Sequence, residues 1–490
     1  MAIRDLREYI TILSKEGEIQ PIETEVDWNL EVGAIIRRSY DLRAPAPFFQ
    51  KVKGYPNGCR ILGAPIGLSR SSGAAYKRLA LSLGMDPAVS VKTIIEEYIR
   101  KKKSPIKPVC ISTGPCKENI HIGDEANLFE FPAPLLHQGD GGRYIGTWHL
   151  VITKDPDSGW VNWGMYRLMI HDRNTLGGII SPNQNIGLHY QKYEARNRPM
   201  EFAIAIGTEP VSSLIAATRI PPEVDEADIV GGIRGEPLEL VHCETVDLEV
   251  PASSEIVLEG IILPNERKEE GPFGEYTGYR AGDRAPRPVY HVKTITHRNA
   301  PILTVSCMGV PVDDAAVVQP VTKAAEILDE LWKAKFPVNM VYCPPEGVSH
   351  LTIVSTKIPY PNYVNQLAHA IWGSTGWGRS CWYLIVVEED IDITQMDQVI
   401  WALTTRCHPY RGIHREPNAP GHPLLPFLNE QEKRNFKAAY VLFDCTWPCD
   451  WSKELIPEKA SFDVMWPKEI QEKVLENWSK YGYKEGGSHD

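Results

Sequence analysis

Six strand-like segments follow one another between about residues 110 and 310, and this run constrains the fold more than any other feature of the chain. Turn sequences such as Asp155-Pro156-Asp157-Ser158-Gly159 separate them. The predicted strands are residues 149–154, 159–170, 202–207, 254–263, 289–296 and 302–308. A barrel or half-barrel is the most economical way to join so many short strands.

The segments on either side of this run alternate helical and strand patterns, which predicts an α/β (α+β) protein. Helical periodicity at 185–196 and 225–233 interrupts the β-rich part, a longer helix is predicted at 321–335, and strands follow at 338–342, 350–356, 382–388 and 438–444. We therefore divide the chain into an N-terminal α/β part (1–110), a β-rich domain (111–312), a linker helix (313–336), a C-terminal α/β domain (337–455) and a terminal segment (456–490).

The terminal segment carries one apolar stripe. Pro467 opens a helical pattern in which Ile470, Val474, Trp478 and Tyr481 share a face. This face can pack on its own domain, which is the commoner arrangement, or dock on a second subunit. The second alternative predicts a homodimer or a higher homo-oligomer.

Composition excludes several classes of protein. The net charge of -11 over 490 residues argues against a nucleic-acid partner. No segment reaches the roughly 18 to 20 apolar residues of a membrane span, and the N-terminus lacks the apolar core of a signal peptide. We expect a cytoplasmic protein.

The ten cysteines lack metal-ligand spacing, so free buried thiols are expected rather than disulfides or a zinc site.

Two carboxylates, Glu270 and Glu275, flank a Gly-Pro-Phe-Gly turn that fixes their separation. Carboxylates held close resist ionising together, and a nearby cation can divide them into a permanent anion and a proton carrier. Arg167 is a candidate cation, because in a strand it would share a face with Trp163 and Met165 and would need an anion. The alternatives are a solvated Glu-rich loop and a surface arginine whose stem lies on a tryptophan.

Side-chain oxygens of Asn162, Asn185 and Glu226 suit a hard divalent cation, which could anchor a phosphate at a helix N-terminus. Asn185 can instead be a simple helix N-cap, and Glu226 can simply favour the helix dipole. The common nucleotide-binding and His-Glu-x-x-His motifs are absent. A phosphate-bearing cofactor would therefore be held in another way.

Taken together, these blocks resemble the UbiD-type decarboxylases that use prenylated FMN, with the ferulic acid and hydroxybenzoate decarboxylase branches as the nearest likeness. The matching blocks, in order, are Asn162-Trp163-(x3)-Arg167, Gln184-Asn185, Asp225-Glu226-Ala227, residues 254–260, Glu270-Gly-Pro-Phe-Gly-Glu275, residues 401–407 and residues 421–426. The resemblance covers nearly the whole chain. It implies a UbiD-like fold in which the β-rich domain is a flavin-binding split β-barrel.

The resemblance also implies roles for individual residues. Arg167, Glu270 and Glu275 match the catalytic set, with Glu275 as the proton donor. The implied cofactor-binding residues are Asn162, Trp163, Gly164, Met165, Tyr166, Arg167, Gln184, Asn185 and Glu226. Asn162, Asn185 and Glu226 match the ligands of a divalent metal, manganese or magnesium, and Trp163, Ala217 and Thr218 match a potassium site. Asn185 stands where relatives usually have histidine, and Arg379 is the candidate replacement for a phosphate-binding lysine.

The function implied is reversible, non-oxidative decarboxylation of an aromatic, heteroaromatic or α,β-unsaturated carboxylic acid, with CO2 as the other product and a UbiX-type flavin prenyltransferase as the source of the cofactor. The predicted substrate pocket contains Ser181, Tyr276, Gln319, His422 and Leu424. Polar side chains there favour a hydroxylated or heteroaromatic acid over cinnamate. The alternatives are a hydrolase with paired carboxylates and a non-catalytic flavin-binding or assembly protein.

Overall fold

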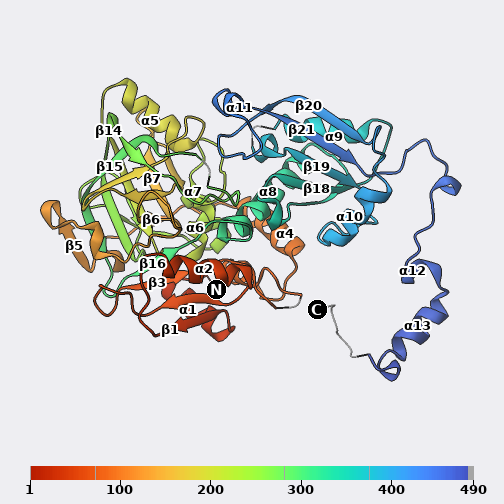
Figure 1. The fold of residues 1–490 in the computed structure, drawn as a ribbon, viewed down its shortest axis with the longest axis horizontal. Helices are drawn as coiled ribbons and strands as arrows, with labels where there is room; N and C mark the ends of the chain where they lie inside the picture. The colour runs from red at the N-terminus through yellow and green to blue at the C-terminus, as the bar shows by residue number, and fades with distance from the viewer. Residues whose placement is uncertain (1, 72, 281, 375, 484–490) are drawn as a thin grey trace.

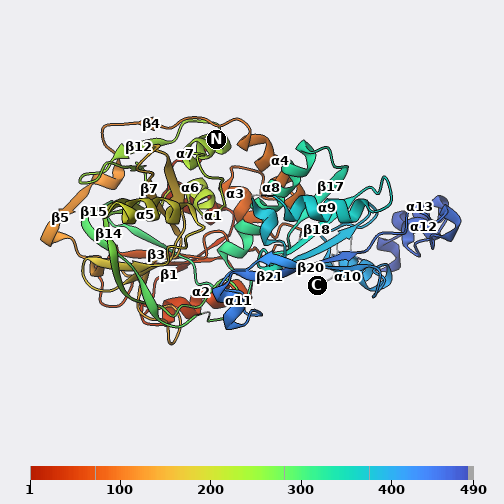
Figure 2. The same cartoon turned by 90° about the horizontal axis from the view of Figure 1, so that it is seen from above.

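Three main sheets and a small fourth sheet organise the computed structural model, which describes residues 2–71, 73–280, 282–374 and 376–483. The N-terminal sheet lies beside the central sheet, and the long helix α8 (Asp314–Lys333) lies between them and the C-terminal sheet (Figures 1 and 2). The expected mixed α/β architecture is therefore present, with α8 in the place of the predicted linker helix.

The N-terminal sheet is completed by a strand from much later in the chain. Its strands, in order, are β1 (Ile19–Ile22), β2 (Ala46–Phe49), β3 (Arg60–Gly63) and β16 (Ile302–Val305). Residues 302–308 were expected among the central strands, and this is wrong, because β16 pairs in parallel with β3 and places Leu303 opposite Ile61. All four β16 residues are buried, so their pattern cannot indicate which sheet they join.

The N-terminal part also contains four helices: α1 (Leu6–Lys15), α2 (Glu31–Asp41), α3 (Lys77–Ser82) and α4 (Val91–Lys102). Ser90 caps α4 by accepting a hydrogen bond from the Thr93 amide at 3.1 Å. The basic residues at its end form ion pairs with α8, Lys102 with Glu326 and Lys103 with Asp329. These two lysines therefore hold α4 against α8.

The central sheet is a curled half-barrel with the strand order β6-β9-β10-β15-β14-β11-β7-β8, and β5 also pairs with β15. Its strands are β5 (Asn119–Ile122), β6 (Tyr144–Gly146), β7 (His149–Lys154), β8 (Val161–Gly164), β9 (Leu168–Ile170), β10 (Thr175–Gly178), β11 (Met200–Ile206), β14 (Ile256–Glu270) and β15 (Ala285–His297). Phe202, Leu258 and Tyr290 belong to the apolar cluster that fills its concave side. The expected half-barrel is confirmed.

One break in this sheet matters for the site. Residues 159–170 were predicted as one strand, but the chain leaves the ladder between Gly164 and Leu168. β8 and β9 are consecutive in sequence yet lie near opposite ends of the strand order. The segment of Met165, Tyr166 and Arg167 therefore crosses between the two edges of the curled sheet, and the strand geometry assumed for Arg167 is wrong.

A small sheet with the order β13-β12-β4 lies outside the half-barrel. Its strands are β4 (Val109–Cys110), β12 (Glu239–His242) and β13 (Glu249–Pro251). Three helices pack on strands of the half-barrel: α5 (Asn185–Ala195), α6 (Pro210–Ala216) and α7 (Glu226–Arg234). Both α6 and α7 contact β8. Short 3₁₀ helices are η1 (Pro115–Lys117), η2 (Gly123–Glu125), η3 (Leu128–Glu130), η4 (Pro345–Gly347), η5 (Trp377–Ser380), η6 (Lys453–Leu455) and η7 (Ser479–Tyr481).

Helix α8 begins seven residues before the predicted start at 321, because Asp313 caps it by accepting from the Ala316 amide at 2.9 Å. Beyond it, the C-terminal sheet has the order β17-β18-β19-β21-β20. Its elements are β17 (Val338–Tyr342), β18 (Leu351–Thr356), α9 (Tyr363–Trp372), β19 (Tyr383–Val387), α10 (Met396–Thr405), β20 (Ile413–Pro420), α11 (Glu430–Arg434) and β21 (Lys437–Asp444). Within the described part of the chain, no helix combines the length and apolarity needed to cross a bilayer.

The terminal segment leaves the body of the molecule. It holds α12 (Phe462–Met465) and α13 (Lys468–Glu476), and both lie apart from the three sheets in two perpendicular views (Figures 1 and 2). Trp466, Ile470, Trp478 and Tyr481 are all exposed. The alternative that this stripe packs on its own domain is therefore wrong for this chain.

Candidate active site

Arg167 joins the two carboxylates that flank the Gly-Pro-Phe-Gly turn. Its Nε donates to Glu270 Oε1 at 3.0 Å and its Nη2 donates to Glu270 Oε2 at 2.8 Å, which is a bidentate pair. Its Nη1 contacts Glu275 Oε1. Glu270 is the last residue of β14, so strand pairing fixes one carboxylate while the turn places the other.

Both carboxylates are buried, with Glu270 1% and Glu275 5% exposed. The solvated-loop interpretation of this turn is therefore wrong. The surface interpretation of Arg167 is also wrong, because its guanidinium lies 5.3 Å from the centre of the Phe273 ring and contacts both carboxylates. A third donor comes from β6, where the Tyr144 hydroxyl donates to Glu270 Oε1 at 2.8 Å.

The turn itself is held from outside. Gly271 has φ +81°, a conformation that side chains other than that of glycine rarely adopt. The Gly274 amide donates to Asp140 Oδ1 at 3.1 Å. The other carboxylate oxygen of Asp140 contacts His137 Nδ1 at 3.0 Å, and His137 Nε2 lies 2.8 Å from the Met308 carbonyl. A Cβ on residue 274 would lie 2.7 Å from the His137 ring, so the turn and this histidine are in close contact.

The electrostatics separate the two carboxylates. Glu270 accepts three hydrogen bonds, two from the Arg167 guanidinium and one from the Tyr144 hydroxyl. Burial raises the pKa of Glu275 above its ordinary value, and the single contact from Arg167 opposes this only in part. The arrangement thus places the bidentate Arg167–Glu270 pair beside one acid, Glu275, that can carry a proton.

The three predicted divalent-metal ligands come from three elements around β8. Asn162 lies on β8, and Asn185 and Glu226 are the first residues of α5 and α7. Asn185 does not cap its helix, because Gln184 is the N-cap and Asn185 is the first helical residue. Its Nδ2 donates to the Ile220 carbonyl at 3.2 Å, so Oδ1 is the atom that would coordinate a metal. The N-cap alternative for Asn185 is therefore wrong.

Glu226 is 1% exposed, and one of its oxygens accepts from the Trp163 amide at 2.9 Å. Among the described residues it forms no ion pair, and burial raises its pKa well above the ordinary value. A buried carboxylate in this position suits a bound cation, because the cation would supply the missing positive charge. The residues present therefore fit a divalent metal.

Tyr166 occupies the space between these elements. Its hydroxyl lies 3.5 Å from Asn162 Nδ2, and a Cβ on Gly164 would lie 2.2 Å from the same hydroxyl. Gln184 is the N-cap of α5 and makes no side-chain cap bond, so the first turn of the helix is available to a phosphate. Met165 completes the crossing between the sheet edges.

The predicted potassium residues lie close to the same strand. Ala217 follows α6, which packs on β8, and the hydroxyl of Thr218 donates back to the Leu214 carbonyl at 2.9 Å. Trp163 is buried on β8. The three residues are thus on neighbouring elements.

The predicted substrate residues form a partial group. The Tyr276 hydroxyl lies 3.4 Å from Nε2 of His350, a residue of the C-terminal part that the sequence did not indicate. Burial, followed by the charges of Lys323 and His422, lowers the pKa of His350 to about 3, so its ring is neutral. His422 therefore lies near this pair, and its Nδ1 accepts from the Leu424 amide at 3.3 Å.

Other predicted residues are not joined to this group by any contact among the described residues. The Ser181 amide donates to Gln184 Oε1 at 3.1 Å, beside α5, and Gln319 is half-buried on α8. Arg379 is half-buried in η5, where its carbonyl accepts from the Tyr440 hydroxyl at 2.9 Å.

Three family models match the chain in order, all described as parts of 3-octaprenyl-4-hydroxybenzoate carboxy-lyase: the N-terminal domain over residues 10–98, the Rift-related domain over 107–311 and the C-terminal domain over 316–445. The pyrrole-2-carboxylic acid decarboxylase of Pseudomonas aeruginosa is 36% identical over 488 residues, which are 98% of each chain. The chain belongs to the UbiD family. The predicted family and the predicted enzyme class, a carboxy-lyase, are confirmed.

Solved UbiD structures share the fold. The vanillic acid decarboxylase of Sedimentibacter hydroxybenzoicus in its closed form matches with a TM-score of 0.84 and 30% identity, over 98% of this chain and 99% of that one. An evolved dimeric form of the UbiD-class enzyme HmfF from Pelotomaculum thermopropionicum, in complex with prFMN, matches with a TM-score of 0.78 and 28% identity, over 93% of this chain and 97% of that one.

Sequence reasoning missed three residues that contact the Glu270 turn, namely Tyr144, His137 and Asp140. All three lie more than 120 residues before the Glu270 turn, so local patterns cannot connect them with it. One signal was available, because Asp140-Gly141-Gly142 has the composition of a turn directly before a strand. It could have marked Asp140 as a candidate for a backbone contact.

Proposed function

We propose that this protein is a prenylated-FMN-dependent enzyme that reversibly and non-oxidatively decarboxylates a heteroaromatic or hydroxylated aromatic carboxylic acid. The single observation that carries the proposal is the buried group in which Arg167 contacts both Glu270 and Glu275. The same arrangement gives a charged clamp and a proton donor within one site, which a decarboxylase needs.

The roles of the residues follow from their contacts. Glu270 accepts two hydrogen bonds from Arg167 and one from Tyr144. Arg167 is thereby held in position to orient the substrate carboxylate. Glu275, with its raised pKa, holds the proton that replaces carbon dioxide on the substrate carbon, and it removes this proton in the reverse direction. When bound, prenylated FMN supplies the electron sink that no side chain provides.

The same proposal gives the polar groups around β8 to the cofactor. Asn162, Asn185 and Glu226 would hold a divalent metal, manganese or magnesium, next to the flavin phosphate, and the uncapped start of α5 would face the phosphate. Backbone groups of Trp163, Ala217 and Thr218 would hold a potassium ion. The cofactor would come from a UbiX-type flavin prenyltransferase.

The substrate class is supported by two independent observations. Tyr276, His350 and His422 place a phenol and two neutral imidazoles near Glu275, and buried polar groups of this kind favour a substrate that hydrogen-bonds with them. The 36% identical relative acts on pyrrole-2-carboxylic acid, which carries a ring N–H donor. We therefore expect pyrrole- or indole-carboxylates and hydroxybenzoates to be preferred over cinnamate.

The test compares protein produced with and without a flavin prenyltransferase, together with the Glu275→Gln variant and the matched control Glu269→Gln. Glu269 is exposed and adjoins the same turn. We expect turnover and substrate hydrogen exchange only in flavin-loaded protein, a loss of about 100-fold or more in Glu275→Gln, and near wild-type rates in Glu269→Gln. Activity in protein shown by mass spectrometry to lack flavin would refute the proposal, and so would an active Glu275→Gln variant.

The exposed arm formed by α12 and α13 supports a homodimer. Trp466, Ile470, Leu475 and Trp478 are all exposed large apolar side chains on this short segment, and such a group marks an interaction surface. The arm would dock on a second copy of the chain. Light scattering should give a dimer for the full chain and a smaller species for an Ile470→Glu, Leu475→Glu variant; an unchanged mass would contradict this assignment.

A further inference from the structure

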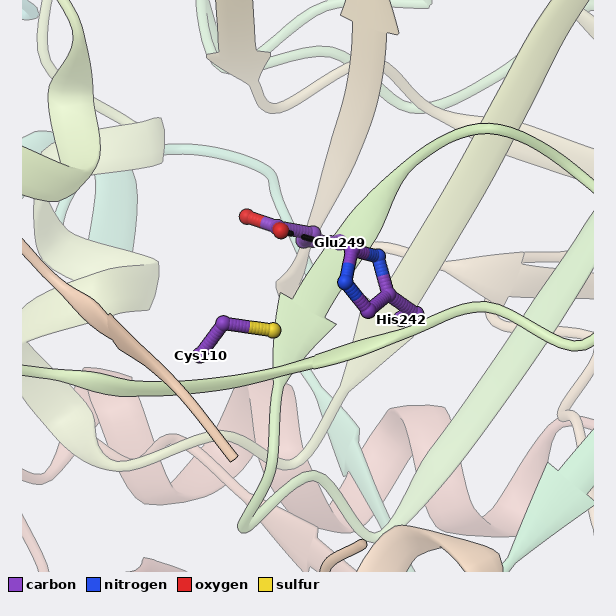
Figure 3. A group of neighbouring side chains, drawn as sticks. All are labelled: Cys110, His242 and Glu249. Carbon is purple, nitrogen blue, oxygen red and sulfur yellow. Dashed lines mark ion pairs between the residues drawn. The ribbon is translucent and has the colours of Figure 1, made fainter. Parts of the chain in front are cut away.

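Three side chains with metal-binding chemistry meet on the small sheet, away from the residues of the candidate active site. They are Cys110 on β4, His242 on β12 and Glu249 on β13 (Figure 3). One ligand atom from each, a sulfur, an imidazole nitrogen and a carboxylate oxygen, lies within 4.8 Å of the other two. His242 and Glu249 form a cross-strand pair at 3.6 Å, and Cys110 adds a third ligand type beside them.

The strand register explains why they meet. His242 lies directly opposite Glu249 in the antiparallel pair of β12 and β13. Cys110 lies opposite Leu240 in the parallel pair of β4 and β12, two residues before His242. Residues two apart in a strand share a face, so Cys110 and His242 are diagonal neighbours on one face of the sheet. The backbone pairing thus fixes the positions from which all three side chains start.

The three ligand atoms lie within 4.8 Å of one another, so small side-chain rotations would bring them to the spacing of a tetrahedral metal site. Zinc binds thiolate sulfur at about 2.3 Å and imidazole nitrogen at about 2.0 Å, so neighbouring ligand atoms lie roughly 3.4 to 3.6 Å apart. His242 Nδ1 and Glu249 Oε1 are 3.6 Å apart, which already matches. Cys110 and His242 are exposed, so a water molecule can take the fourth position.

The surrounding charges favour a cation. Glu239 and Glu244 lie on or next to β12, and Lys117 is paired with Glu244 at 2.6 Å. A cysteine binds a metal as the thiolate and not as the thiol. A metal that binds the thiolate must therefore displace a proton, so binding should strengthen as the pH rises.

We propose that Cys110, His242 and Glu249 form a zinc site that fastens β4 to β12 and β13. β4 contains only two residues, and it lies where the chain passes from the N-terminal helices to the central sheet. A metal bridge across three strands would hold this short crossing in register. The spacing of cysteines in the sequence does not reveal the site, because only one of its three ligands is a cysteine. Cys110 also lies more than 100 residues before His242 and Glu249.

Cobalt titration of the chelator-treated, full-length protein tests this directly. A thiolate ligand gives a charge-transfer band in the near ultraviolet, which neither the Asn162, Asn185 and Glu226 group nor the histidine–glutamate cluster of His121, Glu130 and His297 can produce. We expect the band in the wild type, its displacement by zinc, and its loss in Cys110→Ser. A band that persists in Cys110→Ser, or no band in the wild type, would overturn the proposal.

Thiol labelling gives a second readout with an internal control. Cys110 and Cys449 are both exposed, but within the described part of the chain Cys110 belongs to a cluster of metal-binding side chains and Cys449 does not. Zinc should slow the modification of Cys110 at least tenfold and leave Cys449 unchanged, and His242→Ala or Glu249→Gln should remove this protection. Zinc should also raise the melting temperature of the wild type and of Cys449→Ser, but not of Cys110→Ser. Equal protection of both thiols, or no protection, would refute the site.

Discussion

Replacing His137 by glutamine tests how the turn between Glu270 and Glu275 is held. Burial by itself lowers the pKa of His137, but hydrogen bonds to Asp140 and Cys307 raise it to about 10. The ring is therefore charged at neutral pH and donates from both nitrogens. Asp140, whose side chain is fully buried, uses its other oxygen for the Gly274 amide, so the pair connects the turn to the chain at Met308.

The expected loss of stability depends on pH. The gap between 6.5 in the unfolded chain and about 10 in the folded protein corresponds to about 5 kcal/mol, and partial exposure of the ring reduces this to roughly 3 kcal/mol. A histidine with a raised pKa stabilises the fold fully below pH 6.5, and this contribution disappears as the pH rises through about 10. His137→Gln should therefore cost roughly 3 kcal/mol at about pH 6 and much less near pH 10.

Urea unfolding of wild type and variant between about pH 6 and pH 10 measures this difference. His291→Gln is the matched control, because His291 pairs with Glu266 on the surface at 2.6 Å and such pairs contribute about 1 kcal/mol or less. Turnover of His137→Gln should also fall at unchanged flavin content, because the turn that carries Glu275 loses its support. A stability loss that is the same at both ends of the pH range, or no loss at all, would refute the reasoning.

Three further predictions concern single side chains. Tyr144→Phe removes one hydrogen bond to Glu270 and should lower kcat by about 10- to 100-fold with flavin still bound. A steady-state rate within about twofold of wild type would contradict this role. Asn185→His should tighten manganese binding in a metal titration, since imidazole is the better ligand for transition metals, and weaker binding would count against the assigned site. Burial raises the pKa of Asp313 to about 6, so its stabilising effect is lost as the pH rises through that value. Asp313→Asn keeps the helix cap but loses the bond from the Gly309 amide to the second oxygen at 3.3 Å. Relative to wild type, its unfolding free energy should be about 2 to 3 kcal/mol higher above pH 7 than near pH 4, and an equal change at both would contradict this account.

The fold was predictable where local pattern determines structure. The predicted strand at 149–154 coincides with β7, and the predicted helix starts at 185 and 225 lie within one residue of α5 and α7. The break after Gly164 was not predictable, because no proline or glycine follows it before Leu168 and the curling of the sheet imposes it. β20 was missed because it contains Pro417 and ends at Pro420, residues that a sheet tolerates only at its edge, where β20 lies.

The site was predictable only where motifs carry it. The resemblance supplied Arg167, Glu270 and Glu275, and the structure brings these three into one contact group. Tyr144 and His350 reach the site through pairing of β6 and through the C-terminal part, respectively, and neither has a local signature. Long-range packing, which single-sequence patterns do not encode, decides such contacts.

The late arrival of β16 sets the order in which the chain can fold during synthesis. β3 leaves the ribosome about 240 residues before its partner, so at about 5 to 20 residues per second it waits roughly 10 to 50 s. During that interval the Arg60–Gly63 edge presents unpaired backbone groups, and an open edge of this kind is a template for pairing with another nascent chain. Slower synthesis lengthens the exposure, and a fragment that ends before Ile302 keeps it permanently.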